Sequence, residues 1–257
     1  MVNIKTEKEI QTMKEGGKIL GEILKKLEEA VKPGMTTNNL EELTHELVLS
    51  YGVKSSFLGF EEYPNMLCTS LNDEVVHGLP SDRVLKEGDL LKIDMGVLHK
   101  GFHTDSATTV LVGQKDEVIH ITTLNVVNQK LLISVTKEAL EIGISKAKIG
   151  NTLGDIGSAI QKHVEDRGFN VVRDLVGHGI GREPHEPPQV LNYGKAGTGE
   201  KLIAGMVIAI EPMVVTGKWG IKNGKDGYAF VTKDGGLAAH FEHTIAITEK
   251  GPEILTK

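Results

Sequence analysis

Four acidic residues lie in segments that otherwise have the composition of buried strands. Glu211 stands within MVIAIEPMVV, whose other residues are all apolar, and Glu242 precedes the alternating run HTIAIT. Asp94 and Asp105 lie in LLKIDMGVLHKGFHTDSATT. An isolated ionised carboxylate in a buried strand is very costly unless it is paired, protonated or bound to a metal ion. No Lys or Arg lies within three positions of Glu211 or Glu242, so we expect a metal ion as their partner.

The two aspartates lie on either side of a predicted hairpin turn. If His99 and Lys100 form a two-residue turn, Asp94 lies directly opposite Asp105. Like charges at facing positions are destabilising, and a bound cation would remove the repulsion. A slipped register that exposes one aspartate is equally compatible with this hairpin alone.

Two histidines in a glycine- and proline-rich segment add to the acidic set. In GHGIGREPHEPP, His178 lies between two glycines, which allow the backbone to approach another group closely. His185 follows seven residues later. A dinucleotide-binding GxGxxG fingerprint fails here, because the third glycine is missing and the prolines cannot continue a helix. A solitary histidine is more often structural, but two histidines with four acids predict a metal site.

The charge of this set indicates more than one ion. Four carboxylates and one or two imidazoles carry too much negative charge for a single divalent cation. Two ions bridged by carboxylates and a water balance it better, and paired ions of this kind are used in hydrolysis. Oxygen-rich ligation with imidazole suits Mn, Fe, Co or Zn.

The elements that must position these residues occur in the same order twice. Helices are predicted over about 6–31, 37–51, 116–142 and 151–167, and Thr6 with Glu9, like Thr152 with Asp155, has capping-box spacing. Strand-like segments follow each helix pair. His77, Asp94 and Asp105 follow the first pair, and His178, Glu211 and Glu242 follow the second. The pattern predicts one α+β domain over 1–257, with two similar halves of about 1–113 and 114–257 that face a shared centre.

Composition excludes several other classes of protein. The 257 residues carry a formal charge of −6, which argues against general binding to nucleic acid. A lone cysteine, Cys68, permits no intramolecular disulfide. No segment has the length and apolarity expected of a signal peptide or a membrane helix. We therefore expect a cytoplasmic protein.

Five motifs in order resemble the type I, bacterial-like methionine aminopeptidases. They are NDEVVHGLP, KIDMGVLHKGFHTDSATT, GHGIGREPHEPP, IAIEPM and FEHT, and they span residues 72–244. The resemblance implies the pita-bread fold, in which two pseudo-symmetric halves surround a dinuclear metal site. It implies that Asp105 and Glu242 bridge two divalent ions (Co, Mn, Fe or Zn), that Asp94 binds one of them, and that His178 and Glu211 bind the other.

The resemblance also implies roles for residues that are not ligands. A water bridging the ions would attack the first peptide carbonyl, and Glu211 would move its proton to the leaving amine. His185 would donate a hydrogen bond to the carbonyl oxygen, and His77 would contact the substrate. A methionine pocket would be formed by four residues, namely Phe60, Tyr63, Cys68 and Trp219. Ordinary core packing is the alternative for each of these four.

The implied function is removal of the initiator methionine from nascent proteins, with a preference for a small second residue. Departures from the family pattern are Pro184, where relatives often carry an aromatic pocket residue, and a longer segment over 216–240. Contact with the ribosome is compatible with this role, and short loops with mixed surface charge suit a monomer. Two alternatives are an X-Pro peptidase of the same fold and a binding protein that has lost catalysis. X-Pro enzymes tend to read EPG where this chain has EPM.

Overall fold

The computed structural model describes residues 2–113 and 124–257. Its helices are α1 (Glu7–Ala30), α2 (Thr37–Tyr51), α3 (Leu124–Lys146) and α4 (Leu153–Glu165), with a 3-10 helix η1 (Phe60–Glu62). The helix expected from about residue 116 begins outside the described residues, and α3 ends at Lys146, four residues beyond the predicted end.

Local hydrogen bonds explain where the helices begin. The Thr6 hydroxyl accepts from the Glu9 N–H and the Glu9 carboxylate accepts from the Thr6 N–H, which confirms the predicted capping box of α1. The Asp155 carboxylate accepts from the Thr152 N–H at the start of α4. These contacts satisfy N–H groups that have no partner within the helix. Gly52 ends α2 in the left-handed conformation, as its position predicts.

Most strands belong to one nine-stranded sheet. Its order is β1-β4-β5-β14-β9-β7-β8, with β2 on β4 and β15 on β14. These strands are β1 (Lys54–Ser55), β2 (Cys68–Leu71), β4 (Leu90–His99), β5 (Phe102–Leu111), β7 (Gly177–Gly179), β8 (Glu186–Val190), β9 (Val207–Ile210), β14 (Glu242–Thr248) and β15 (Gly251–Ile254). Because β5 pairs with β14, strands from both predicted halves of the chain share this sheet.

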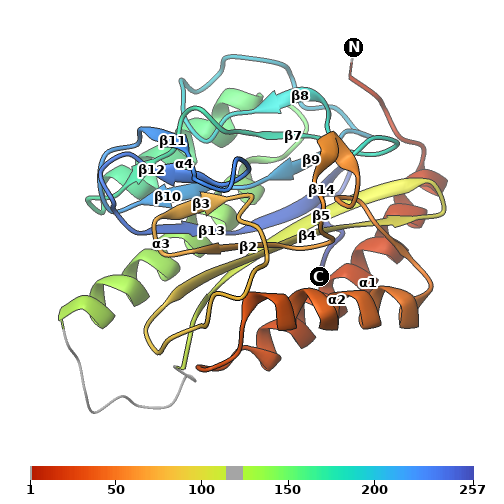
Figure 1. Cartoon of the computed structure of the whole chain (residues 1–257). Coiled ribbons are helices and arrows are strands. Elements are labelled where there is room, and N and C mark those ends of the chain that lie inside the picture. The colour runs from red at the N-terminus through yellow and green to blue at the C-terminus, as the bar shows by residue number, and fades with distance from the viewer. Residues whose placement is uncertain (1, 114–123) are drawn as a thin grey trace.

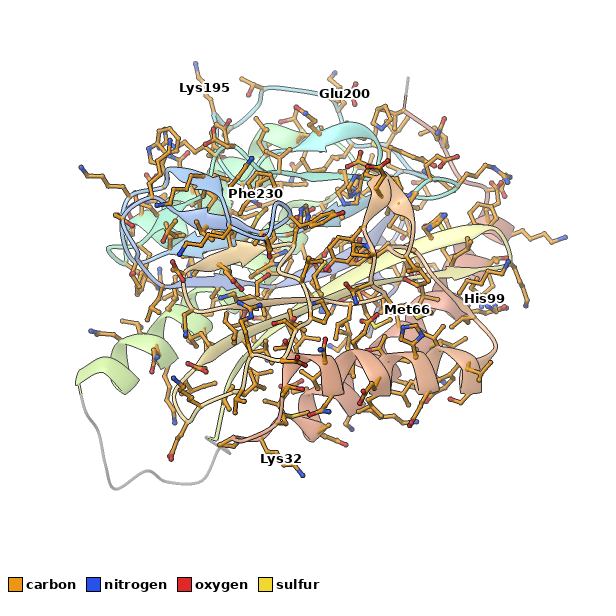
Figure 2. The ribbon with its side chains drawn as sticks, viewed as in Figure 1. Lys32, Met66, His99, Lys195, Glu200 and Phe230 are labelled. Carbon is orange, nitrogen blue, oxygen red and sulfur yellow. The ribbon has the colours of Figure 1, made fainter. Side chains whose placement is uncertain are left out.

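Two small sheets flank the large one. One has the order β13-β10-β6, and the other β11-β12-β3. Their strands are β3 (Glu74–Val76), β6 (Asn170–Val171), β10 (Met213–Val215), β11 (Ile221–Asn223), β12 (Phe230–Thr232) and β13 (Ala238–His240). In Figure 1 these strands gather at the left of the large sheet, and Phe230 of β12 is labelled in Figure 2.

The β4–β5 hairpin differs from the predicted register. Its turn is Lys100–Gly101, with φ of 50° and 84°, so Asp105 lies opposite Gly96 and Asp94 lies opposite Ala107. The prediction that Asp94 faces Asp105 directly was wrong. Two residues with positive φ fit the right-handed twist of a hairpin, and Lys-Gly supplies them better than His-Lys. The shift is two positions, and an even shift keeps both aspartates on one face of the sheet.

Helices cover the opposite face of the sheet. Ile93, Met95 and Val97 of β4 alternate with Asp94 and pack in a core with residues of α1 and α2. A second core joins α3 and α4 to β9 and β14. Figure 1 shows α1 and α2 side by side beneath the sheet. The acidic residues therefore face away from the helices.

None of the helices within residues 2–113 and 124–257 is long and apolar enough to cross a membrane.

Candidate metal centre

The register of the large sheet brings residues of four strands into one row. Cys68 pairs with Asp94, Asp94 with Ala107, and Ala107 with Glu242. Residues paired across neighbouring strands project from the same face, and so does Asp105, which lies two positions before Ala107. The row therefore places three of the four predicted acids on one face.

Strands β9 and β7 carry the remaining members of the predicted set. His243 pairs with Ile210, so Glu211, which follows β9 directly, continues the chain beside Glu242. In β7, Gly179 pairs with Ile208, and His178 precedes it. The His178 Nε2 atom lies 3.4 Å from the Glu211 Oε1 atom. Consecutive sheet neighbours thus bring His178 and Glu211 to the acids of the hairpin.

Ligand atoms within this group lie close enough to share a cation. One atom from each of Asp105, His178 and Glu242 lies within 4.8 Å of the others. Burial and the charge of the neighbouring Asp105 raise the pKa of Asp94, so the two carboxyls lie close together. All five residues predicted as ligands are therefore gathered in one place.

Burial and mutual repulsion perturb the four carboxyl groups. Burial raises the pKa of Asp94, Glu211 and Glu242 well above the ordinary range, and the charges of neighbouring carboxylates raise it further. Burial raises the pKa of Asp105 to about 7. Groups with strongly perturbed pKa values that lie together are typical of functional sites. Divalent cations would remove both the cost of burial and the repulsion.

Unpartnered oxygens show that the residues fit such cations. Within residues 2–113 and 124–257, Asp94 Oδ1, Asp105 Oδ1 and Glu242 Oε1 are buried and have no hydrogen-bond partner. Buried polar atoms are almost always hydrogen-bonded, and ionised carboxylates can only accept. These oxygen lone pairs have no hydrogen-bond donor, and they belong to a set of four acids and an imidazole. Mn, Fe, Co and Zn prefer oxygen and imidazole ligands of this kind.

His178 is held in the form that a metal ligand requires. Its Nδ1 atom lies 2.9 Å from the Gly179 carbonyl oxygen, and because a carbonyl only accepts, Nδ1 carries the proton. This leaves the Nε2 lone pair directed at the acidic group, as is usual for metal-binding histidine. Burial and the nearby His185 lower the pKa of His178 to about 3, so the imidazole is neutral at physiological pH.

The two histidines not predicted as ligands lie at the edge of this group. The His185 ring centre is 4.2 Å from that of His178 and 5.1 Å from that of Phe60. His77 follows β3 with a φ of 60°, and its ring packs edge-to-face on Phe230 at 5.8 Å. Burial lowers the pKa of His77 to about 4, and the nearby His185 contributes. Both histidines are therefore near the centre.

The four predicted pocket residues differ in their burial and in the residues that they contact. Cys68 is buried beside Asp94, and the Tyr63 hydroxyl donates to the carbonyls of Leu67 and Gly78. Phe60 lies against His185. Trp219, by contrast, is 40% exposed and its ring stacks on the Arg173 guanidinium at 5.3 Å.

Two residues near the site were missed by the sequence analysis. The aromatic ring against Tyr63 belongs to Tyr228, at 5.5 Å and edge-to-face. His240 is buried, and its Nε2 atom lies 3.7 Å from Glu211 Oε2. Alternation could have found His240, which lies two positions before Glu242. No signal distinguished Tyr228, because it lies in a loop whose course the sequence does not define.

Known proteins resemble the chain over its whole length. The model of metallopeptidase family M24 matches residues 11–249. A methionine aminopeptidase of Clostridium acetobutylicum is 48% identical over 257 residues, covering 100% of this chain and 99% of the relative. Methionine aminopeptidase 1 of Bacillus subtilis is 42% identical, with full coverage of both chains.

Solved structures agree with the sequence relatives. The crystal structure of the Thermotoga maritima methionine aminopeptidase has a TM-score of 0.93 and 46% identity, and covers 100% of both chains. The prolidase of Pyrococcus furiosus has a TM-score of 0.76 and 24% identity, and this chain covers 65% of it. The prolidase therefore shares the pita-bread fold, as predicted, but over only part of its length.

Proposed function

The chain belongs to metallopeptidase family M24 and, within it, to the methionine aminopeptidases, and we propose that it removes methionine from the N-termini of polypeptides. The observation that carries this function is the group of three buried carboxyls, Asp94, Asp105 and Glu242, with Glu211, whose side chain is 12% exposed, and the neutral imidazole of His178. Neither a structural core nor a binding surface needs so many acids without basic partners.

Five residues would hold two divalent ions. Asp94, Asp105, His178, Glu211 and Glu242 would together supply the oxygen and nitrogen ligands. Ions in this setting supply a water of lowered pKa and polarise the carbonyl of the bond to be cleaved. Support comes from the buried oxygens of Asp94, Asp105 and Glu242, which lack hydrogen-bond donors.

The chain's own groups would move protons and hold the substrate. The Glu211 carboxylate, at the edge of the acidic group beside His178, would accept the proton of the attacking water and return it to the leaving amine. The His185 N–H would donate to the carbonyl oxygen as negative charge develops there. Neighbouring groups partly desolvate His185 and lower its pKa, so the ring has one N–H and one lone pair at neutral pH. His77 would contact the substrate backbone as a neutral imidazole.

The methionine side chain would lie among Phe60, Tyr63, Cys68 and Tyr228. These residues lie beside Asp94 and His185, and sulfur and aromatic edges suit a thioether. We place Tyr228 in this pocket instead of Trp219, because Tyr228 contacts Tyr63 and Trp219 contacts Arg173.

Shortening Tyr228 to alanine is expected to impair methionine recognition. One wall of the pocket would be lost, so kcat/KM for a methionyl peptide should fall about tenfold or more. Trp219→Ala is the matched control, and as a surface change it should stay within about twofold. Steady-state kinetics with Met-Ala-Ser measure both. A larger loss for Trp219→Ala than for Tyr228→Ala would return Trp219 to the pocket.

The nearest alternative substrate class is a peptide with proline in second position. The structural likeness to prolidases shows the shared fold alone, whereas full-length relatives at 40–48% identity are named methionine aminopeptidases. We expect release of methionine from Met-Ala-Ser and no cleavage of peptides such as Ala-Pro-Ala. Comparable rates on both peptides would contradict this specificity. On this proposal the natural substrates are nascent polypeptides in the cytoplasm. The enzyme would act on them as a monomer near the ribosome.

A further inference from the structure

A buried ion pair joins the start of the chain to the segment that carries His185. The Lys5 Nζ atom donates to Glu186 Oε2 at 2.6 Å, and the two side chains are only 5% and 3% exposed. Removing one partner of such a pair leaves an uncompensated buried charge, which is strongly destabilising. The pair links residues 181 positions apart, so it fixes one segment against the other.

The Glu186 carboxylate also shapes the turn that leads to His185. Its other oxygen, Oε1, accepts from the N–H groups of Arg182 at 2.7 Å and Glu183 at 3.2 Å. Burial alone would raise the pKa of Glu186, but the hydrogen bond from Lys5 and further donors outweigh it, and the pKa lies below the ordinary value. The Glu186 side chain is therefore an ionised carboxylate at neutral pH, which can accept hydrogen bonds from all of these donors.

Lys5 itself is rigidly placed. Its backbone N–H donates to the Gly205 carbonyl at 2.8 Å. A Cβ atom added to Gly181 would lie 2.4 Å from Lys5 Cε, so the lysine stem lies directly on that glycine. The Gly181 carbonyl in turn accepts from the His103 N–H at 2.7 Å. Figure 1 shows the extended N-terminal segment descending beside the end of the sheet formed by β7 and β8.

His185 and Glu186 point in opposite directions. They are consecutive residues at the start of the extended strand β8, where Glu186 is buried and His185 is exposed. Among the described residues His185 has ring contacts with Phe60 and His178 but no hydrogen bond to its side chain. Its location therefore depends on the backbone that Glu186 anchors from behind.

We propose that Lys5 and Glu186 are positioning residues, which hold the backbone of His185 so that its imidazole reaches the carbonyl oxygen of the bond to be cleaved. This inference rests on the role of His185 in the proposed function. Lys5 would thereby influence the chemical step through the backbone of His185. A misplacement of a hydrogen-bond donor by about 1 Å can cost about 100-fold in rate.

A double-mutant cycle with His185 tests the proposal. Lys5→Met should lower kcat for Met-Ala-Ser about tenfold or more and leave KM within about twofold. In a His185→Ala background, Lys5→Met should cause no further loss, because the group that it positions is absent. An equal loss in both backgrounds would mean that Lys5 acts through general stability and would overturn the proposal.

Two further variants separate positioning from folding. Lys14→Met breaks an exposed ion pair between Lys14 of α1 and Glu253, and it should leave kcat unchanged. If Lys5→Met does not fold, Lys5→Met combined with Glu186→Gln removes the unpaired charge while keeping an acceptor for the turn. The combined variant should fold and still show the loss of kcat. A combined variant that folds with the parent's kcat would contradict the proposal.

An NMR measurement tests the positioning role of Lys5 independently of catalytic activity. Imidazole NMR signals of His185, assigned by their absence in His185→Ala, should shift or broaden in the Lys5 variants, whereas those of His45 on α2 should not change. Unchanged His185 signals would overturn the positioning role. A parent protein that releases no methionine would instead count against the proposed function, and the NMR result would still stand.

Discussion

Replacing Glu211 with glutamine is expected to lower kcat for methionine release by about 10²- to 10⁴-fold, the range that a general acid–base group contributes. The amide has nearly the same shape, but it cannot accept the proton of the attacking water. It also removes a negative charge beside His178, where the Nε2–Oε1 distance is 3.4 Å, so affinity for divalent ions should fall as well. Steady-state kinetics at saturating Mn²⁺, with metal affinity from calorimetry, measure the two effects separately.

Glu249→Gln provides the matched control for this substitution. Glu249 is exposed and follows β14, so the same chemical change there should leave kcat within about twofold, as surface changes usually do. If Glu211→Gln retained the parent's kcat at saturating metal, Glu211 would not be the proton carrier, and the buried carboxyl would have only a structural role.

Removing the divalent ions is expected to destabilise the protein, and more strongly at high pH. The pKa of Asp105 lies at about 7 in the metal-free fold, against an ordinary 3.8, because of burial, and the pKa values of Asp94, Glu211 and Glu242 are also raised. A carboxyl with a raised folded pKa holds its proton more tightly when folded. Its contribution to the free energy of unfolding is therefore fully present below the pKa that the carboxyl has in the unfolded chain. This contribution is lost as the pH rises towards the pKa that the carboxyl has in the folded protein.

The melting temperature of metal-free protein should therefore fall between about pH 4 and pH 7, the ordinary and the raised pKa of Asp105. Mn²⁺ at about 1,000 times its Kd adds about 4 kcal/mol, which corresponds to a rise of roughly 10 °C for a chain of this size. The rise should be larger at pH 8, because protons no longer compete for the ligands. Asp105→Asn should reduce both the pH dependence and the effect of Mn²⁺. A melting temperature that responds to neither pH nor Mn²⁺ would contradict a metal centre at these residues.

Sequence reasoning worked best where the determinants are local. The capping box at Thr6 and Glu9 and the left-handed Gly52 follow from residues that contact their near neighbours. Strand periodicity assigned Asp94 and Asp105 to one face, and this survived an error in the turn, because the register moved by two positions. A one-residue slip would have separated them.

Features that depend on distant contacts escaped prediction. Tyr228 meets Tyr63 only because β12 pairs with β3, an association of segments some 150 residues apart. The pair of Lys5 and Glu186 is likewise invisible in a lysine- and glutamate-rich sequence, where most such residues are solvated. The resemblance to the methionine aminopeptidases suggested Trp219 as a wall of the pocket, but its ring packs on Arg173. The division into halves at about residue 113 stays a prediction, although strands from both halves share the large sheet.

The most direct test of the metallopeptidase account is release of free methionine from Met-Ala-Ser by protein stripped of metal and then titrated with Mn, Co, Fe or Zn. The N-acetylated peptide serves as the control for a requirement for the free amine. The account predicts no release from either peptide before metal is added, and release from the free peptide alone once at least one of the metals is present. No release with any of the four metals, or equal release from the stripped protein, would contradict it.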